Sequence, residues 1–254
     1  MIESLPLAVT GVTTMLGARI LTNATGFFFE RDGSLYVVTS RHVVLDEASE
    51  HHPDRIEIEL HVNQQNLGET VQFSIPLYRD GKSVWREGLD SAGAIDVVAI
   101  LLERAMLPGK FYHRAFTPEH LYRRLELVEM GASVLIVGFP LGVHDTLHRL
   151  PVARHAVVAS SFGIRFQGKG CFLTDARLHR GTSGAPVVAR KPGYVKGGRN
   201  GRSDFPWMLL GVHSAKLDVT NRDSSQDESL DLNFAWYADI LMTLTSPPQR
   251  PLAA

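Results

Sequence analysis

The sequence predicts an all-β fold, a barrel or a sandwich, because three observations agree. Short apolar or alternating runs recur along the chain, and they are rich in Val, Ile, Phe and Leu, which suit pleated surfaces. Turn-forming residues separate the runs, as at Asp32 and Gly33 or Asp80 and Gly81. Long helical patterns are rare. The expected strands cover residues 26–29, 35–39, 55–62, 71–77, 96–102, 134–139, 155–160, 170–174, 185–189 and 207–212.

Two segments have the spacing of amphipathic helices. Residues 118–129 follow a favourable N-cap, Thr117, and place apolar side chains three and four residues apart, which predicts a short linking helix. Residues 235–244 predict a C-terminal helix. The glycine-rich basic segment 191–206 and the acidic segment 218–231 are expected to be exposed loops. The basic loop either recognises acidic groups or is simply solvated.

Charge and cysteine content limit the classes of partner. The 254 residues carry a formal net charge of −1, so no overall field draws the chain to nucleic acid or anionic lipid. We expect no nucleic-acid partner and no membrane association, since no apolar run reaches the ~18 residues of a spanning helix. Cys171 is the only cysteine, which favours a reducing compartment. Because the N-terminus lacks a basic and apolar leader, a cytoplasmic protein is expected.

A glycine-flanked serine is the strongest chemical signal. Ser183 lies between Gly181-Thr182 and Gly184, directly before an apolar run, and glycines allow a sharp turn and close approach to a ligand. Such a turn exposes the Ser183 hydroxyl and aims the N–H groups of Gly181 and Ser183 at one point. This is the arrangement that an oxyanion hole requires. Taken alone, however, a serine in such a turn is a weak indication of catalysis.

A serine hydroxyl needs a base, and the chain provides one with a suitable carboxylate. His42 follows the β-rich run 35–39, whereas most of the eleven histidines have no such context. Asp96 begins the apolar run 96–102, where an acid is costly unless it has a dedicated hydrogen-bond partner. The alternative for Asp96 is a carboxylate that merely caps a turn. Together the three residues have the composition of a catalytic triad.

With these motifs in order, the chain resembles the trypsin/chymotrypsin superfamily, and specifically its bacterial stand-alone trypsin-like peptidases. The resemblance rests on the segments around His42, Asp96 and Ser183 and extends from about residue 12 to 245. It implies two six-stranded antiparallel Greek-key β-barrels in one functional unit. The first barrel, residues 1–115, would carry His42 and Asp96, and the second, residues 116–254, would carry Ser183 and the C-terminal helix.

The chain also departs from the family pattern. Thr182 stands where zymogen-activated trypsins have an aspartate, so activation by N-terminal cleavage is not supported. Arg180 stands where relatives often have proline or glycine, close enough to the predicted oxyanion hole to obstruct or assist it. The sequence does not decide between these two effects.

Specificity is suggested by residues 211–215. Within the resemblance, His213, Ser214 and Ala215 lie on the strand that lines the primary specificity pocket, and the histidine matches glutamyl endopeptidases and viral proteases that cut after glutamine. An imidazole can donate a hydrogen bond to a carboxylate or amide, and Arg177 would add positive charge. The hypothesis is a preference for Glu, Asp or Gln before the scissile bond. The alternative is that His213 only packs in its strand and Arg177 points outward.

The predicted activity is hydrolysis of protein or peptide substrates by a serine endopeptidase through an acyl-enzyme. No cofactor is implied. No metal is expected either, because the histidine pairs 51–52 and 144/148 lack the cysteine or carboxylate framework of zinc sites. Two alternatives stay open, a catalytically silent barrel that binds peptides and a protease held inactive until an unidentified activating partner orders its loops.

Overall fold

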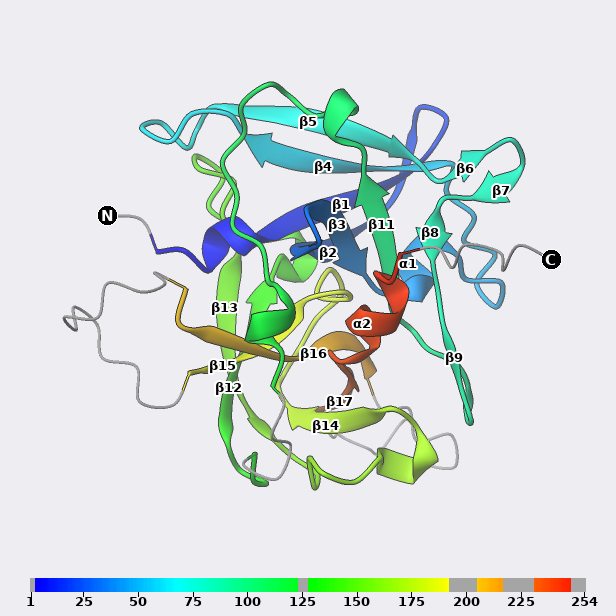
Figure 1. Ribbon diagram of the computed structural model, residues 1–254, viewed down its shortest axis with the longest axis vertical. Helices are drawn as coiled ribbons and strands as arrows, with labels where there is room; N and C mark the ends of the chain where they lie inside the picture. The colour runs from blue at the N-terminus through cyan, green and yellow to red at the C-terminus, as the bar shows by residue number, and fades with distance from the viewer. Residues whose placement is uncertain (1–2, 123–127, 192–204, 217–230, 248–254) are drawn as a thin grey trace.

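The computed structural model divides the chain into two β units (Figure 1), and it describes residues 3–122, 128–191, 205–216 and 231–247. Seven strands form the first sheet, in the order β5-β4-β1-β2-β3-β11-β8, and six strands close the second barrel, in the order β12-β13-β14-β17-β16-β15. The first-sheet strands are β1 Val9–Leu16, β2 Arg19–Arg31, β3 Ser34–Thr39, β4 Arg55–His61, β5 Thr70–Pro76, β8 Trp85–Arg86 and β11 Val98–Leu102. The barrel strands are β12 Ser133–Gly138, β13 Val152–Val158, β14 Cys171–Asp175, β15 Pro186–Arg190, β16 Trp207–Lys216 and β17 Leu232–Tyr237.

Shorter elements complete the fold. Two small hairpins pair β6 Tyr78–Arg79 with β7 Lys82–Ser83 and β9 Leu89–Asp90 with β10 Gly93–Ala94. The α-helices are α1 Arg41–Val44 and α2 Ile240–Leu244, and the 3₁₀ turns are η1 Pro6–Ala8, η2 Arg104–Met106, η3 Pro118–His120, η5 Pro140–Gly142 and η6 Phe166–Gly168. In the described part of the chain, no helix combines the length and apolar composition that a membrane crossing needs.

The all-β double-barrel class predicted from the sequence is confirmed, with one difference in strand number. The second unit is a closed barrel of six strands, as expected. The first unit was expected to have six, but the short β8 pairs with β11 and extends that sheet to seven. The predicted domain boundary at residues 115 and 116 falls between β11 and β12.

Turn chemistry explains the hairpins. Asp32 and Gly33 have φ angles of 50° and 74°, and they connect β2 to β3. Asp80 and Gly81 have φ angles of 52° and 72°, and they connect β6 to β7. Positive φ at both central residues is typical of a tight turn whose twist matches the flanking strands, and Asp-Gly favours it. These turns agree with the prediction.

Three apolar clusters form the core. One fills the first unit, with Phe28 and Ile100 among its members, and a second fills the closed barrel, with Phe172. The third joins the two units, because it includes Phe27 of β2 and Leu241 of α2. Figure 1 accordingly shows α2 at the level where the upper and lower units meet. The site described below lies where the two units are held together.

In the described residues, both predicted helices are shorter than expected. Only η3 forms at the start of residues 118–129, and Leu121 is already extended, with φ −73° and ψ 136°, because it makes a parallel bridge with Leu209 of β16. Residues 123–127 of that prediction lie outside the described residues. Thr117 is the N-cap, and its N–H donates to His120 Nδ1 at 2.9 Å.

The C-terminal helix begins later than predicted, and two predicted loops are not described. Residues 235–237 belong to β17, because they pair with β14 and β16, and α2 starts only at Ile240. The prediction of helix over 235–237 was therefore wrong. Most of the predicted loops 191–206 and 218–231 lies outside the described residues.

Candidate active site

The register of β3 and β11 brings His42 to Asp96. The two strands are antiparallel, with Thr39 opposite Val98, so the chain that leaves β3 passes beside the chain that enters β11. His42 lies on α1, which begins directly after β3, and the buried residues Val43 and Val44 anchor this turn. Two segments 54 residues apart therefore meet at the end of one sheet.

Asp96 holds His42 at two points. The His42 backbone N–H donates to Asp96 Oδ1 at 2.8 Å, and Nδ1 of the imidazole lies 2.7 Å from Asp96 Oδ2. The Ser214 hydroxyl of β16 also donates to Asp96 Oδ2. The carboxylate is only 23% exposed, and these donors satisfy it. A carboxylate at Nδ1 fixes the proton there and leaves Nε2 as the acceptor, which is the orientation required of a general base.

The pKa of His42 reflects two opposing effects. Burial of the imidazole alone lowers the pKa, because the charged form loses solvation. The hydrogen bond and the charge of Asp96, together with the charge of Asp46, outweigh burial and raise the pKa of His42 above its ordinary value of 6.5. Asp46 accepts hydrogen bonds from the Ser49 hydroxyl at 2.5 Å and the Ala48 N–H at 3.2 Å, and its own pKa is lowered.

Glycine is required on both sides of Ser183. Gly181 has φ +94°, and a Cβ there would lie 2.4 Å from the Phe139 carbonyl oxygen. Gly184 has φ +85°, and a Cβ there would lie 2.2 Å from the Thr25 carbonyl oxygen. Both positions combine a left-handed backbone with a contact that no side chain tolerates. The sequence prediction of a sharp, glycine-dependent turn at the serine agrees with this geometry.

Two backbone donors beside Ser183 are free. Within the described residues, the N–H groups of Gly181 and Ser183 donate to no protein acceptor. The Leu141 N–H donates to the Arg180 carbonyl oxygen at 2.6 Å, and in a trans peptide this turns the Gly181 N–H to the opposite side. These are the properties that an oxyanion hole needs, namely oriented and uncommitted donors.

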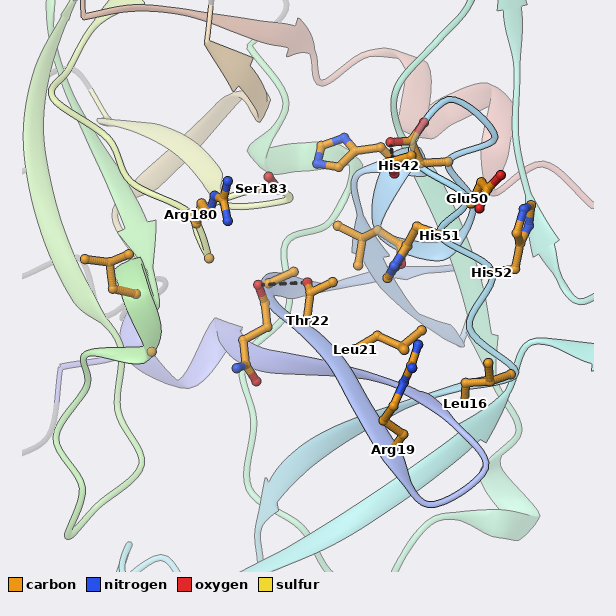
Figure 2. Close-up of a pocket in the computed structure, with 18 residues that line it drawn as sticks. Leu16, Arg19, Leu21, Thr22, His42, Glu50, His51, His52, Arg180 and Ser183 are labelled. Atoms are coloured by element: carbon orange, nitrogen blue, oxygen red, sulfur yellow. Dashed lines mark hydrogen bonds between the residues drawn. The ribbon is translucent and has the colours of Figure 1, made fainter.

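The Ser183 hydroxyl and His42 face one pocket without a direct hydrogen bond. Ser183 Oγ donates to the Ser214 carbonyl oxygen at 3.2 Å, and no hydrogen bond links it to His42 in the described structure. Both side chains nevertheless line a cavity of about 860 Å³, together with Gly181 and Arg180. Figure 2 shows Ser183 and His42 at the same end of this cavity. The structure therefore pairs two members of the predicted triad and places the third beside them.

Thr25 of β2 joins the serine turn to the first sheet, a role that was not predicted from the sequence. Its N–H donates to the Ser183 carbonyl oxygen at 2.9 Å, and its hydroxyl donates to the Gly181 carbonyl oxygen at 2.7 Å. The same hydroxyl accepts the Phe139 N–H at 3.1 Å. A threonine in a strand is usually explained by β propensity, so only the fold reveals this role.

Among the described residues that line this cavity, none was predicted for specificity, although the Ser214 carbonyl accepts the hydrogen bond from Ser183. His213 is buried in β16, and burial lowers its pKa to about 3, so the imidazole is neutral. Its Nδ1 atom has no hydrogen-bond partner among the described residues. Arg177 is exposed, and its carbonyl accepts Arg154 Nη2 at 2.8 Å. Ala215 lies in β16 after Ser214. Neither His213 nor Arg177 lines the cavity beside Ser183.

No metal site is formed by the residues that the structure describes, because no three His, Cys, Asp or Glu side chains gather in a way that would hold an ion. His144 and His148 make hydrogen bonds to other protein groups. His148 Nδ1 lies 2.7 Å from Asp145 Oδ2, and His144 Nδ1 lies 2.6 Å from the Gly142 carbonyl oxygen.

The sequence profile of a family described as "Trypsin-like peptidase domain" matches residues 24–197. A solved structure of the serine endoprotease from Yersinia pestis is similar, with a TM-score of 0.52 and 16% identity over 95% of this chain and 62% of its own. A protease from M. tuberculosis in its active form gives a TM-score of 0.49 and 16% identity, over 94% and 79% of the two chains. No curated protein matches the chain by sequence.

Proposed function

Because the chain belongs to the trypsin-like peptidase domain family, we propose that it is a serine endopeptidase that hydrolyses peptide bonds through an acyl-enzyme. The observation that carries this proposal is the two-point hydrogen bond of Asp96 to the backbone and imidazole of His42. A carboxylate that only capped a turn would have no reason to bond to Nδ1 of His42. His42 in turn lines the same cavity as Ser183.

Each residue then has a defined part in acyl transfer. His42 Nε2 takes the proton of Ser183 as its oxygen attacks the scissile carbonyl, and the N–H groups of Gly181 and Ser183 stabilise the resulting oxyanion. His42 returns the proton to the leaving amine and then activates the water that releases the acyl group. Asp96 holds the imidazole in the required tautomer and stabilises its charged form.

The position of the Ser183 hydroxyl supports a second candidate, a latent barrel. Its bond to the Ser214 carbonyl directs the proton away from His42. Turning the hydroxyl to His42 requires a change of side-chain rotamer, and catalytic hydrogen bonds often tighten only when substrate binds. The active enzyme is the proposal that we favour, and the uncommitted N–H groups of Gly181 and Ser183 and the His42–Asp96 hydrogen bond support it.

For specificity we propose a preference for Glu, Asp or Gln before the scissile bond, in protein or peptide substrates. His213 supports this because its imidazole is neutral, buried and lacks a partner at Nδ1. A substrate carboxylate or amide oxygen would accept a hydrogen bond from such a ring. Arg177 would add only a distant charge, because its side chain is exposed. The lone Cys171 favours a reducing compartment such as the cytoplasm for this reaction.

A peptide library tests both activity and specificity. The wild-type protein should cleave after Glu, Asp or Gln, and His213→Val should lower kcat/KM for these peptides about tenfold by removing one hydrogen bond in a buried site. His155→Val makes the same chemical change at an exposed position of β13 and should have no effect. Cleavage after Lys, Arg or Phe with none after acidic residues or Gln would refute the preference.

The raised pKa of His42 predicts how hydrolysis depends on pH. A general base works only when neutral, so activity should be lost as the pH falls through that raised pKa. Asp46→Asn removes one of the charges that raise the pKa, and the acid limb of kcat/KM against pH should therefore move to lower pH. The matched change Asp80→Asn, at the β6–β7 turn, should leave the limb unmoved. A limb that stays in place or moves upward in Asp46→Asn contradicts this assignment.

A further inference from the structure

The cavity beside Ser183 extends away from the strand to which acyl-side specificity was assigned. Its lining comes from the β1–β2 hairpin, the segment 46–52, the 141–142 turn and the serine turn, and none of the described residues of β16 contributes. His42 and Ser183 stand at one end of it (Figure 2). His42 must pass its proton to the leaving amine of the substrate. The part of the substrate that follows the scissile bond therefore begins at this end of the cavity.

The edge of β2 suits an extended peptide in this cavity. β3 pairs only with residues 27–31 of β2, which leaves residues 19–26 without a strand partner on the side away from β1 in the described structure. On that side the Thr25 N–H already bonds to the Ser183 carbonyl. The backbone N–H and C=O groups of successive strand residues point to opposite edges, so those of Asn23, two residues before Thr25, point to the same edge as those of Thr25. Asn23 also lines the cavity. Extended peptides bind by adding to such edges.

An irregularity in β2 directs an apolar side chain to the same place. Thr14 pairs with Thr22 and Met15 pairs with Ile20, so Leu21 is an extra residue without a partner on β1. Bulges of this kind occur next to active sites, where they redirect side chains. Leu21 lines the cavity, and so does Leu141 of η5, which is 67% exposed. These two side chains offer apolar contact to a peptide in the cavity.

Arg180 brings a positive charge to the wall of the cavity beside Ser183. Arg180 precedes the oxyanion-hole residue Gly181 and lies next to Ser183 in Figure 2. Among the described residues, no carboxylate forms an ion pair with it. The carboxylates of the cavity belong to the segment 46–52, where Asp46 is bonded to Ser49 and Glu50 lies beside His52 on another wall. An exposed guanidinium over a cavity edge is suited to a carboxylate ligand.

We propose that Arg180 selects an acidic side chain at the first or second position after the scissile bond of a peptide substrate in this cavity. The inference rests on the proposed function. It also assigns Arg180 a role that the sequence left open, as a residue that assists substrate binding beside the oxyanion hole. The interaction lies at the surface, where an ion pair contributes about 1 kcal/mol at most, or about fivefold in affinity.

The test compares peptides that share one acyl side and carry Asp, Gln or Lys at the first two positions after the cleaved bond. Wild type should give kcat/KM about fivefold higher for Asp than for Lys. Arg180→Gln should bring that ratio to about one, and Arg180→Glu should reverse it. Arg79→Gln, an exposed arginine of the β6–β7 hairpin, should leave the ratio as in wild type. The wild-type preference should shrink in about 1 M salt, where charges are screened within about 3 Å.

Binding measurements separate this inference from the proposed activity. Ser183→Ala cannot turn over, so competition of the same peptides for it reports selectivity alone, with Asp again expected to bind more tightly than Lys. Equal binding of the two peptides, or a ratio that Arg180→Gln does not change, overturns the inference even if wild type is an active protease. Selective binding without any hydrolysis by wild type would instead refute the endopeptidase, while leaving the selection of acidic side chains by Arg180 in place.

Discussion

Ser183→Ala and His42→Ala are each expected to lower kcat for peptide hydrolysis by about 10⁶, the scale on which members of such a triad act together. Alanine at 183 removes the oxygen that forms the acyl-enzyme, and alanine at 42 removes the base that activates it. The double variant should be no slower than either single variant, because the two residues act as one unit.

The measurement is the initial rate on a quenched peptide that wild type cleaves. Both side chains are partly exposed at the cavity, so neither substitution should unfold the protein, and unchanged thermal unfolding serves as the control. Peptide binding should persist in Ser183→Ala. If Ser183→Ala retained more than about a hundredth of the wild-type rate, another nucleophile would carry the reaction, and the assignment of Ser183 would be wrong.

Asp96→Asn is expected to lower kcat by about 10⁴ while leaving the fold intact. The asparagine amide is close in size to the carboxylate and keeps an oxygen that accepts the His42 backbone N–H. An NH₂ group facing Nδ1 would favour the tautomer with its proton on Nε2, and that ring cannot accept the proton of Ser183.

Two comparisons make this result specific. Asp80→Asn applies the same chemical change to an exposed turn and should leave kcat unaltered. Ser214→Ala removes the third donor to Asp96 without changing the His42 tautomer, so its effect should be much smaller than that of Asp96→Asn. An Asp96→Asn rate within tenfold of wild type would show that Asp96 only caps the turn before β11.

His42, Asp96 and Ser183 could be predicted from the sequence because each lies in a distinctive local pattern. His42 follows a run of buried β residues, Asp96 precedes another, and Gly181 and Gly184 flank the serine. The strand register then brings the first two together, since Thr39 lies opposite Val98. Local pattern and tertiary pairing agree at these positions, and consistency of that kind makes a prediction dependable.

Other features depend on contacts that a single sequence does not display. β1 was not predicted as a strand, because threonines and Gly11 interrupt its apolar residues, yet the Thr10 and Thr14 hydroxyls bond to the backbone of β4 and β2. The predicted helix after Thr117 stops at His120, because Leu121 is held by β16. In both cases a tertiary contact overrides local propensity.

The hydrogen bonds that link the two units were also not predicted from the sequence. Thr25 binds Gly181 and Ser183 across more than 150 residues of chain, and the Ser40 hydroxyl of the first unit reaches the His213 carbonyl of β16 at 3.1 Å. These bonds set the serine turn against the His42–Asp96 pair. The relative positions of Ser183, His42 and Asp96 therefore depend on ordinary strand residues whose role appears only when the two units are in contact.

The central claim is that Ser183 is a nucleophile activated by His42, and labelling with a fluorophosphonate probe tests it most directly. Mass mapping of the labelled wild-type protein should place a single adduct on Ser183, and His42→Ala should acquire none under the same conditions. A folded wild-type protein that stays unlabelled, or one labelled equally well in His42→Ala, would contradict the claim.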